Sequence, residues 1–388
     1  MTNHRLIHPC FNADVRHQYG RIHLPVAPKC NIQCNYCNRK YDCVNESRPG
    51  VTSKVLSPGQ AFAYLEKFLK INSNISTVGI AGPGDPMANP DETLETIGLI
   101  HEAHPELIFC LSTNGLKLSP YIGELNKLGV THVTVTLNAI DPAIGARIYA
   151  WVRDGKVVYR GYDGAALLLE RQLLAIAELK QWGFVVKVNT IIIPGVNDHH
   201  LTAVAQKVAE LGADVMNCMA LFPAPNSNFA ELKAPSHQVV EQVRQQGERY
   251  LPQMKHCARC RADAAGLIGE TMNPAAFKLL EEAAQLPLHP EEERPYIAVT
   301  TLEGILINQH LGEADQIYIF KVNSGTVELV EIRPTPPPGG GEERWKNVSK
   351  ILGDCHTLLV NGIGKTPTGI LKESGINIYE TEGIIDTA

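Results

Sequence analysis

The segment Cys30-Asn-Ile-Gln-Cys34-Asn-Tyr-Cys37 places three cysteines within eight residues. It closely follows an apolar run, Ile22–Val26, that is typical of a β-strand. Three thiolates at this spacing can fold around one corner of a cubane cluster and ligate three of its four irons, which leaves the fourth iron without a protein ligand. The competing interpretation is a zinc knuckle, but tetrahedral zinc needs a fourth ligand that this segment does not supply.

Outward from this motif, short apolar runs alternate with longer amphipathic segments. Six strands are predicted, at Ile22–Val26, Thr77–Ala81, Leu107–Ser112, His132–Leu137, Phe184–Ile193 and Asp214–Leu221. Helices are expected between most of them, one of which begins at Ser57-Pro58, a good N-cap and first-turn pair. Nearly continuous apolar strands are typical of a parallel sheet covered by helices. The sequence therefore predicts a partial (β/α)6 TIM-like barrel, whose ligands gather at the C-terminal ends of its strands.

A second pattern begins after a polar, proline-bearing connector. Strands are predicted at Tyr296–Thr300, Ile305–Ile307, Gln316–Val322 and His356–Val360, with a helix at Glu342–Leu352. We therefore expect four parts: an N-terminal segment (residues 1–20), a barrel with a cysteine-bearing extension (21–283), a linker (284–293) and a smaller α/β domain (294–388).

Composition narrows the class of protein. A hydrophobic fraction of 44% and a net charge of −6 are ordinary for a globular chain and do not favour a nucleic-acid partner. No apolar stretch is long enough to span a bilayer and no signal peptide is recognisable, so we expect a cytoplasmic protein without a membrane partner. In that reducing compartment, the ten cysteines favour metal ligation over disulfides.

The three-cysteine motif, with aromatic Tyr36 before its last cysteine, resembles that of the radical SAM superfamily. The resemblance implies a catalytic 4Fe–4S cluster on Cys30, Cys34 and Cys37, whose open iron binds S-adenosylmethionine (SAM). Reductive cleavage of SAM there releases a 5′-deoxyadenosyl radical. The expected SAM contacts are Tyr36, Gly82, Gly84, Asp85, Ser112, Asn114 and Asn138. The segment Gly82-Pro-Gly-Asp85 departs from the superfamily's usual Gly-Gly-Glu, and the contacts that follow the strands are equally well explained as ordinary β–α turns.

Five further cysteines and a histidine meet the count of six ligands for two more cubanes. Longer runs around them, such as His8-Pro-Cys10, Ala81–Pro86 and Cys257-Ala-Arg-Cys260-Arg-Ala-Asp, resemble the NifB family of radical SAM enzymes. This resemblance covers the whole barrel. It implies that two 4Fe–4S clusters are fused with a SAM-derived carbide and an added sulfur, which gives the 8Fe–9S–C precursor of the nitrogenase FeMo cofactor.

The same resemblance implies a ligand set for each substrate cluster. Cys43 and Cys110 hold the first, together with an N-terminal histidine, His4 or His8, and with Glu46 as a further labile ligand. Cys10, Cys257 and Cys260 hold the second. Arg48 balances cluster charge, although a surface ion pair is the alternative for both Glu46 and Arg48. Cys218 is predicted to be a buried strand residue and Cys355 a structural one.

Residues from about 294 onward resemble the NifX-like cofactor-binding family, which has a ribonuclease H-like α/β fold. The segment Asn308-Gln-His310-Leu-Gly312 carries this resemblance, with Asn361–Gly364 as a turn close by. It implies a domain that receives or shields the finished cluster through His310, against the alternative of a docking module. Expected protein partners are a cluster donor, an electron donor and a downstream cofactor carrier. Two rival functions remain: a peptide-modifying radical SAM enzyme with auxiliary clusters, and a non-catalytic iron–sulfur carrier.

Overall fold

The computed structural model describes residues 7–45, 50–258, 260–269, 274–286, 294–323 and 326–385. It divides into two compact units, residues 1–284 and 285–388. Most of the predicted linker lies outside the described residues, as do His4, Glu46 and Arg48. Within the described ranges, no helix is long and apolar enough to cross a membrane.

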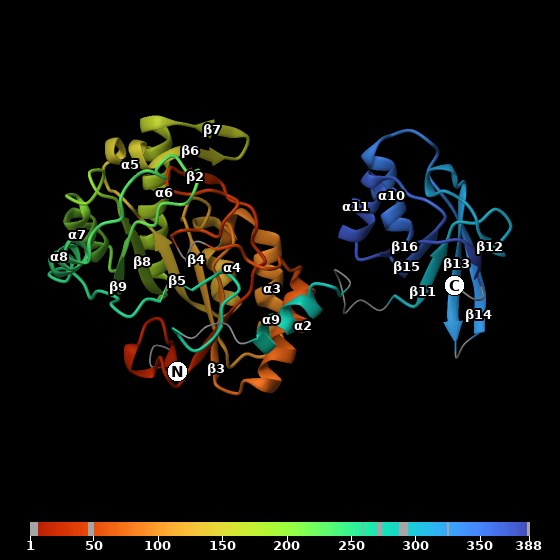
Figure 1. Ribbon diagram of the computed structural model, residues 1–388, viewed down its shortest axis with the longest axis horizontal. Coiled ribbons are helices and arrows are strands. Elements are labelled where there is room, and N and C mark those ends of the chain that lie inside the picture. Colours follow the sequence, from red (N-terminus) through yellow and green to blue (C-terminus); the bar gives the residue numbers. More distant parts are fainter. Residues whose placement is uncertain are drawn as a thin grey trace. The chain divides into compact units, whose positions relative to one another are not determined.

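The first unit is built on a curled sheet of six parallel strands (Figure 1). These strands, in spatial order, are β1 (Gly20–His23), β3 (Ile75–Ile80), β4 (Ile108–Thr113), β5 (Val130–Thr136), β8 (Val185–Ile192) and β9 (Val215–Ala220). Short β10 (Ala265–Gly266) pairs antiparallel with β1 at the sheet edge. The six parallel strands correspond to the six predicted from the apolar runs, which confirms the partial barrel.

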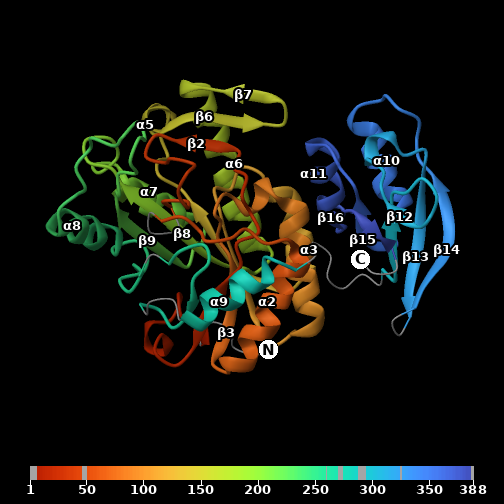
Figure 2. The same ribbon diagram turned by 45° about the vertical axis from the view of Figure 1, so that its right-hand side comes forward.

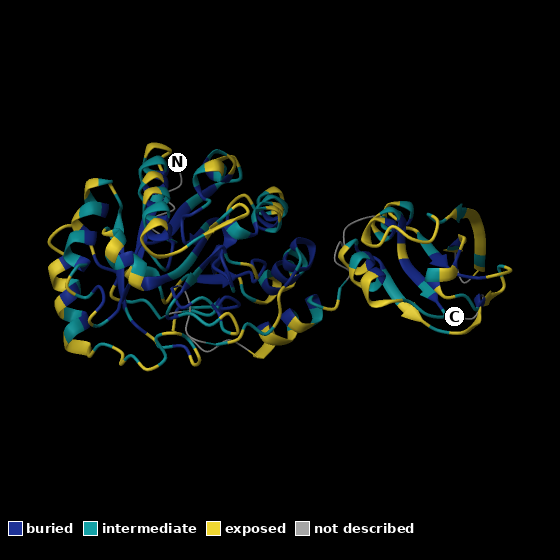
Figure 3. Ribbon diagram, turned by 90° about the horizontal axis from the view of Figure 1, so that it is seen from above, coloured by how far each residue is buried: buried dark blue, intermediate teal, exposed yellow. Residues whose placement is uncertain are grey.

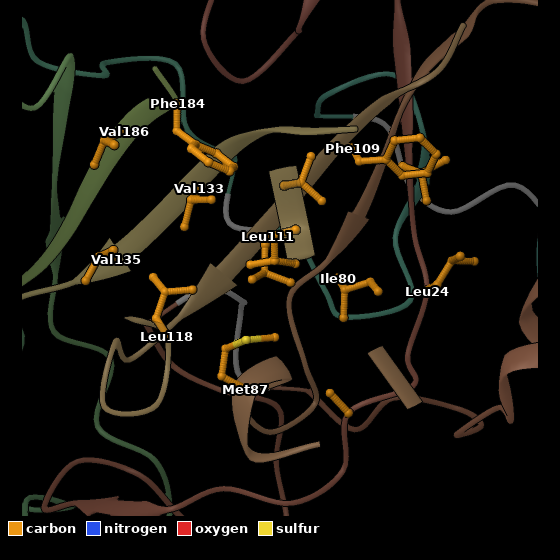
Figure 4. Close-up of a cluster of buried hydrophobic side chains, with 14 of the residues drawn as sticks. Leu24, Ile80, Met87, Phe109, Leu111, Leu118, Val133, Val135, Phe184 and Val186 are labelled. Carbon is orange, nitrogen blue, oxygen red and sulfur yellow. The ribbon is translucent and has the colours of Figure 1, made fainter. Parts of the chain in front are cut away.

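Helices cover the outer face of this sheet, and Figure 3 shows their exposed sides turned away from the buried strands. Their bounds are α2 (Pro58–Ile71), α3 (Pro90–Ala103), α4 (Ile122–Lys127), α5 (Pro142–Ile148), α6 (Gly161–Gln181), α7 (Leu201–Glu210), α8 (His237–Gly247) and α9 (Pro274–Ala283). As predicted, α2 begins at Ser57, which forms a reciprocal capping box with Gln60. Strand and turn residues such as Leu111, Val133 and Leu118 form part of the core between sheet and helices (Figure 4). Burial of this apolar surface is the main stabilising term of the unit.

The first strand differs from its predicted range. It spans Gly20–His23 rather than Ile22–Val26. Pro25 has no N–H to donate to a ladder, so strand pairing ends before it. The shift brings Arg21 into the strand, where it and His23 are both buried.

A small second sheet was not predicted. It consists of β2 (Ile32–Cys34), β6 (Tyr149–Asp154) and β7 (Val157–Tyr159), and it lies at the top of the unit in Figures 1 and 2. Strand β2 lies inside the cysteine motif and pairs antiparallel with β6, with Gln33 opposite Trp151. The motif is therefore held by backbone pairing to a segment more than a hundred residues away in the sequence.

The second unit contains a five-stranded sheet in the order β14-β13-β11-β15-β16. The bounds are β11 (Tyr296–Val299), β13 (Gln316–Asn323), β14 (Thr326–Pro334), β15 (Cys355–Val360) and β16 (Asn377–Glu380), with helices α10 (Glu342–Ile351) and α11 (Lys365–Glu373) and the pair β12 (Leu306–Ile307) and β17 (Gly383–Ile384). The first three strands along the chain are antiparallel neighbours, and the last two add in parallel beside β11. This arrangement confirms the ribonuclease H-like prediction. Strand β14 was not predicted because most of its side chains are exposed and it lacks a continuous apolar run.

Candidate metal-cluster site

Eight of the ten cysteines line two cavities in the first unit. The motif cavity, of about 400 Å³, is lined by Cys30, Cys34, Cys37 and Cys43. The inner cavity, of about 600 Å³, is lined by Cys10, Cys110, Cys257 and Cys260. Ser112 lines both cavities, so they are neighbours. The predicted extra cysteines are thus brought together, except that Cys43 joins the three motif cysteines.

The motif cysteines are held by a network of backbone and amide groups. The Gln33 side chain donates to the carbonyl oxygens of Cys34 at 3.1 Å and Cys37 at 2.8 Å, which fixes the turn between them. Amide nitrogens approach two of the sulfurs: Asn114 Nδ2 lies 3.9 Å from Cys30 Sγ, and Asn45 Nδ2 lies 4.0 Å from Cys34 Sγ. Such N–H groups aimed at sulfur tune the potential of a cluster held there.

Burial keeps these thiols protonated in the absence of metal. It raises the pKa of Cys30 to about 12 and that of Cys34 further, where the neighbouring Cys37 thiol adds to the effect. Burial also raises the pKa of Cys37, against the nearby Arg39 charge. Cluster binding therefore has to displace protons, since thiolates are the ligands.

The motif cavity presents the three thiols of the cysteine motif. Among the described residues, no three His, Cys, Asp or Glu side chains converge on one ion position. A tetrahedral zinc site needs that convergence, whereas a cubane offers each cysteine a separate iron. Three cysteines of one motif line a single cavity, and this is the donor set that a 4Fe–4S cluster with one iron open for SAM requires.

Four of the predicted SAM contacts line the motif cavity: Gly84, Asp85, Ser112 and Asn114. The Asp85 carboxylate accepts hydrogen bonds from the Thr113 hydroxyl at 2.9 Å, the Asn114 N–H at 2.6 Å and the Met87 N–H at 2.9 Å. Burial raises the pKa of Asp85, and these donors oppose that shift. The side chain thus ties the turns after β3 and β4 together at the rim of the cavity.

Tyr36, Gly82 and Asn138 are not among the described residues that line this cavity. The buried Tyr36 hydroxyl donates to Asn45 Oδ1 at 2.6 Å and accepts from Asn138 Nδ2 at 2.8 Å. These two hydrogen bonds orient the Asn45 side chain toward Cys34. Roles for these three residues in SAM binding remain predictions.

The inner cavity brings Cys10, Cys257 and Cys260 together. Burial raises the pKa of Cys10 to about 11, and the nearby Cys260 and Cys257 thiols also raise it, against the charges of Lys187 and Arg21. Cys10 lies on the N-terminal segment, where His8 and Phe11 stack against His132 of β5 with ring centroids 4.5 and 4.7 Å away. This packing places the N-terminal segment inside the barrel.

Two histidines line the inner cavity, and they differ in which ring nitrogen carries the proton. His23 Nδ1 lies 3.1 Å from the carbonyl oxygen of Arg261, so this nitrogen carries the proton and Nε2 has a free lone pair. His8 Nδ1 instead accepts from the Cys10 N–H at 3.1 Å, so its Nε2 carries the proton. Burial lowers the pKa of both rings, to about 4 for His23, which keeps them neutral.

The Nε2 atom of His23 lies close to a cysteine sulfur. A Cβ atom at Gly79 would be 3.0 Å from Cys110 Sγ and 3.3 Å from His23 Nε2, so sulfur and nitrogen flank the same glycine. An N–H donated to a carbonyl with the other nitrogen free is the arrangement of most metal-bound histidines. His23 can therefore ligate iron beside Cys110, whereas His8 can donate a hydrogen bond.

Arg21 supplies a buried positive charge at the same site. It is 3% exposed, and its Nη2 donates to Cys260 Sγ at 2.8 Å. Its Nη1 donates to the carbonyl oxygens of Gly266 on the neighbouring β10 and of Leu267 just after it, which fixes the guanidinium. The guanidinium thus brings a buried positive charge directly against the Cys260 sulfur.

Sequence reasoning missed Arg21, His23 and Lys187. Arg21 and His23 occupy alternate positions of β1, and Lys187 lies on β8 with its Nζ 5.3 Å from the centroid of the Phe11 ring. A basic residue at every second position of an otherwise apolar strand was the available signal, because alternate side chains share one face.

The remaining candidates are not among the residues that line either cavity. Cys218 is 1% exposed in the core at β9, and Cys355 is buried in the core of the second unit, as predicted. His310 is exposed, and its Nδ1 accepts from the Gly312 N–H at 3.0 Å, which leaves a proton on Nε2. Gly362, within the predicted turn, pairs with His310.

Comparison with known proteins gives the family. Residues 24–208 match the model of the radical SAM superfamily, and residues 293–388 match the model named dinitrogenase iron-molybdenum cofactor. The FeMo cofactor biosynthesis protein NifB of Chlorobaculum tepidum is 55% identical over 383 residues, covering 98% of this chain and 90% of that protein. The protein of that name from Klebsiella pneumoniae is 37% identical, covering 95% and 86%. The crystal structure of Streptococcus suis SuiB bound to S-adenosylmethionine is a distant neighbour, at a TM-score of 0.43 and 14% identity over 61% of this chain and 50% of that one. By its sequence over nearly its whole length, this chain belongs to the NifB family of radical SAM enzymes.

Proposed function

We propose that this protein assembles the precursor of the nitrogenase FeMo cofactor by joining two 4Fe–4S clusters with a SAM-derived carbide and an added sulfur. One observation carries the proposal: a cavity lined by four cysteines and a ligand-competent histidine adjoins the motif cavity across Ser112. The relatives named for FeMo cofactor biosynthesis support it. We expect the reaction to take place in the cytoplasm, with separate proteins that deliver clusters and electrons and that remove the product.

Cys30, Cys34 and Cys37 would hold the SAM cluster, which supplies the electron for reductive cleavage of SAM. Asn114 and Asn45 direct amide N–H groups toward the first two sulfurs. Asp85 positions the Asn114 backbone, so that the wall of the motif cavity is set before SAM binds. Such preorganisation keeps a reactive cosubstrate in a single orientation.

Cys10, Cys257 and Cys260 would hold one substrate cluster, with Arg21 donating to Cys260. Cys110 and His23 would hold the other, with Cys43 reaching it from the motif cavity. We favour His23 over His4 and His8 as the nitrogen ligand, because its Nε2 lone pair lies beside Cys110. Imidazole suits iron but binds it less tightly than a thiolate, which favours the release of a cluster that is a substrate.

The inner cavity also excludes water from the substrates. Its wall includes the apolar side chains of Phe11, Ile80, Leu111 and Met254. Low polarity strengthens the few polar interactions present and protects a carbon that is losing its hydrogens from reprotonation by solvent. His8 would donate its Nε2–H to a cluster sulfide or a thiolate.

The second unit would receive or shield the finished cluster. His310 is exposed on it, and because Nδ1 accepts from Gly312, the free nitrogen is a donor. In this tautomer, His310 would donate an N–H···S hydrogen bond to a sulfide of the cluster and would not ligate iron through a lone pair.

The function is tested with anaerobically reconstituted protein, SAM and dithionite. We expect both S-adenosylhomocysteine and 5′-deoxyadenosine, and a product cluster that activates apo-nitrogenase. Cys30→Ala should abolish 5′-deoxyadenosine, whereas Cys218→Ala, a cysteine outside both cavities, should leave it unchanged. Absence of both SAM products from the wild type would exclude the mechanism, and a modified peptide in place of an active cluster would support the rival enzyme.

A further inference from the structure

Two segments that meet in the small sheet are unusually basic. Residues 29–40, which contain the cysteine motif, and residues 147–160, which contain β6 and β7, together carry seven basic side chains and one acidic one. The whole chain has a net charge of −6. The two segments that are joined by the β2–β6 pairing are therefore rich in positive charge, although Lys29 is paired with Glu92 at 3.6 Å.

The register shows which side chains face outward. Val152 is fully buried against the barrel and is paired with Ile32 and Tyr159. Alternate residues take the opposite face, so Trp151 and Arg153 point away from the barrel, Arg153 opposite Val158. Arg160, two residues after Val158, and Lys156, in the turn between β6 and β7, are exposed as well. We call the set Trp151, Arg153, Lys156, Val158 and Arg160 the hairpin face.

The basic side chains of this face are not neutralised internally. Among the described residues, Arg153, Lys156 and Arg160 form no ion pair, and the nearby Asp154 is paired with Arg171 at 3.9 Å. Buried or paired charges would be screened by their partners, whereas these project a field into solvent. Val158, 47% exposed, and the partly exposed Trp151 add apolar surface at its centre.

The face is directly connected to the cluster ligands. Gln33 lies opposite Trp151 on β2, and its side chain donates to the carbonyl oxygens of Cys34 and Cys37. Cys34 is itself a residue of β2. A single residue therefore separates Trp151 from the backbone of two motif cysteines.

We propose that the hairpin face docks an acidic one-electron carrier protein that reduces the cluster on Cys30, Cys34 and Cys37. The inference rests on the proposed function, since reductive cleavage of SAM needs an electron from outside the chain. One electron leaves the carrier's redox centre and enters the cluster, with no bond made or broken at this step. A small charged patch around one aromatic side chain fits such an encounter, because interfaces of electron-transfer complexes are small and steered by charge.

The test uses the full-length reconstituted protein and a reduced acidic two-cluster bacterial ferredoxin, freed of excess reductant. Ferredoxin oxidation is followed by stopped-flow absorbance, and 5′-deoxyadenosine is measured with ferredoxin and, separately, with dithionite. In the triple variant Arg153→Glu, Lys156→Glu, Arg160→Glu, we expect the second-order rate constant at low salt to fall at least about tenfold. Cleavage driven by dithionite, a small reductant that needs no docking, should be unchanged.

The matched control reverses three exposed basic residues elsewhere in the barrel unit: Lys70→Glu, Lys127→Glu and Arg249→Glu. It makes the same change in net charge and should react with ferredoxin like the wild type. Should the hairpin-face variant accept electrons as fast as this control, the proposal is wrong. It is equally wrong if the variant is reduced normally but acquires less iron from a cluster carrier, because the face then serves delivery.

The wild-type protein gives a test that needs no variant. Its rate constant with ferredoxin should fall steeply with ionic strength, as the screening length shrinks from about 10 Å at 0.1 M to about 3 Å at 1 M salt. A salt-independent rate would overturn the proposal. Failure of dithionite to drive cleavage in the wild type would instead count against the proposed function.

Discussion

At the scale of single residues, the hydrogen bonds at Nδ1 of His23 and His8 determine whether Nε2 of each ring has a free lone pair or carries a proton. The Arg261 carbonyl accepts a hydrogen bond from His23 Nδ1–H, whereas the Cys10 N–H donates a hydrogen bond to His8 Nδ1. Of the two rings in this cavity, His23 can therefore ligate iron and His8 can donate a hydrogen bond.

This division predicts different effects of two substitutions. His23→Ala should remove the nitrogen coupling from the pulsed EPR spectrum of the reconstituted substrate clusters, and lower the iron content. His8→Ala should retain the coupling, because its Nε2 carries a proton and does not bind iron. Retention of the coupling in His23→Ala, or its loss in His8→Ala, would contradict the assignment.

Arg21 should set the reduction potential of the cluster on Cys260. Its N–H···S bond and positive charge stabilise the more negative, reduced state. Arg21→Met should therefore shift the midpoint to more negative values in an EPR redox titration, and Arg21→Lys should shift it less because the charge remains. An unchanged midpoint in Arg21→Met would show that Cys260 does not hold a redox-active cluster.

At the scale of elements, close backbone approach joins the turn after β3 to the cysteine motif. A Cβ atom at Gly84 would lie 2.1 Å from the carbonyl oxygen of Lys29, the residue before Cys30. Gly84→Ala must therefore displace the start of the motif. We expect a lower occupancy of the SAM cluster by iron and sulfide analysis, whereas Gly98→Ala in α3, where the nearest atom to a Cβ is Leu128 Cδ2 at 3.7 Å, should retain it.

A histidine–carboxylate pair joins α2 to the segment after α3 and predicts a pH dependence of stability. A hydrogen bond to Glu66 raises the pKa of His104 above its ordinary value of 6.5. The stabilisation is thus complete below pH 6.5 and is lost as the pH rises through the higher folded-state pKa. The pair is partly exposed, so we expect no more than about 1 kcal/mol.

Urea unfolding across this pH window should show a loss of unfolding free energy in the wild type that is absent from Glu66→Gln. The difference between the two proteins isolates this pair from other titrating histidines. Equal pH dependence in both would show that the pair contributes nothing.

Strands with continuous apolar runs were predictable from the sequence. Short strands that are recognisable only from their pairing with distant segments were not. The six barrel strands follow their apolar runs, and α2 begins at its predicted cap. By contrast, β2 and β7 are three residues each and are defined only by their partners. The predicted range of β1 began one residue after Arg21 and therefore excluded it, whereas His23 lay within that range but its role was not inferred.

The candidate site was predictable as a set of cysteines but not as a geometry. Close spacing in the sequence identified the motif, and number and spacing identified the others. The packing of distant segments determines two features of the site. It places Cys43 in the lining of the motif cavity, and it places a histidine of β1 beside Cys110. Hydrogen bonds that select a tautomer have no counterpart in the sequence.

At the scale of the whole molecule, the proposed function assigns SAM cleavage to the first unit and retention of the product to the second. Both cavities are lined by residues of the first unit, and the second unit matches a separate family model. A chain that ends at residue 286 should therefore cleave SAM at the wild-type rate but release its product cluster more readily on gel filtration. Complete loss of SAM cleavage would contradict this division of labour.

The account as a whole depends on three clusters in one barrel, one of which is held only by the motif cysteines. The most direct test of this cluster count is iron and sulfide analysis combined with EPR. It compares the anaerobically reconstituted wild type with the triple variant Cys30→Ala, Cys34→Ala, Cys37→Ala. We predict three cubanes in the wild type and two in the variant, with the SAM-induced change in the EPR spectrum lost. An unchanged cluster count, or stoichiometric zinc at the motif of the wild type, would contradict it.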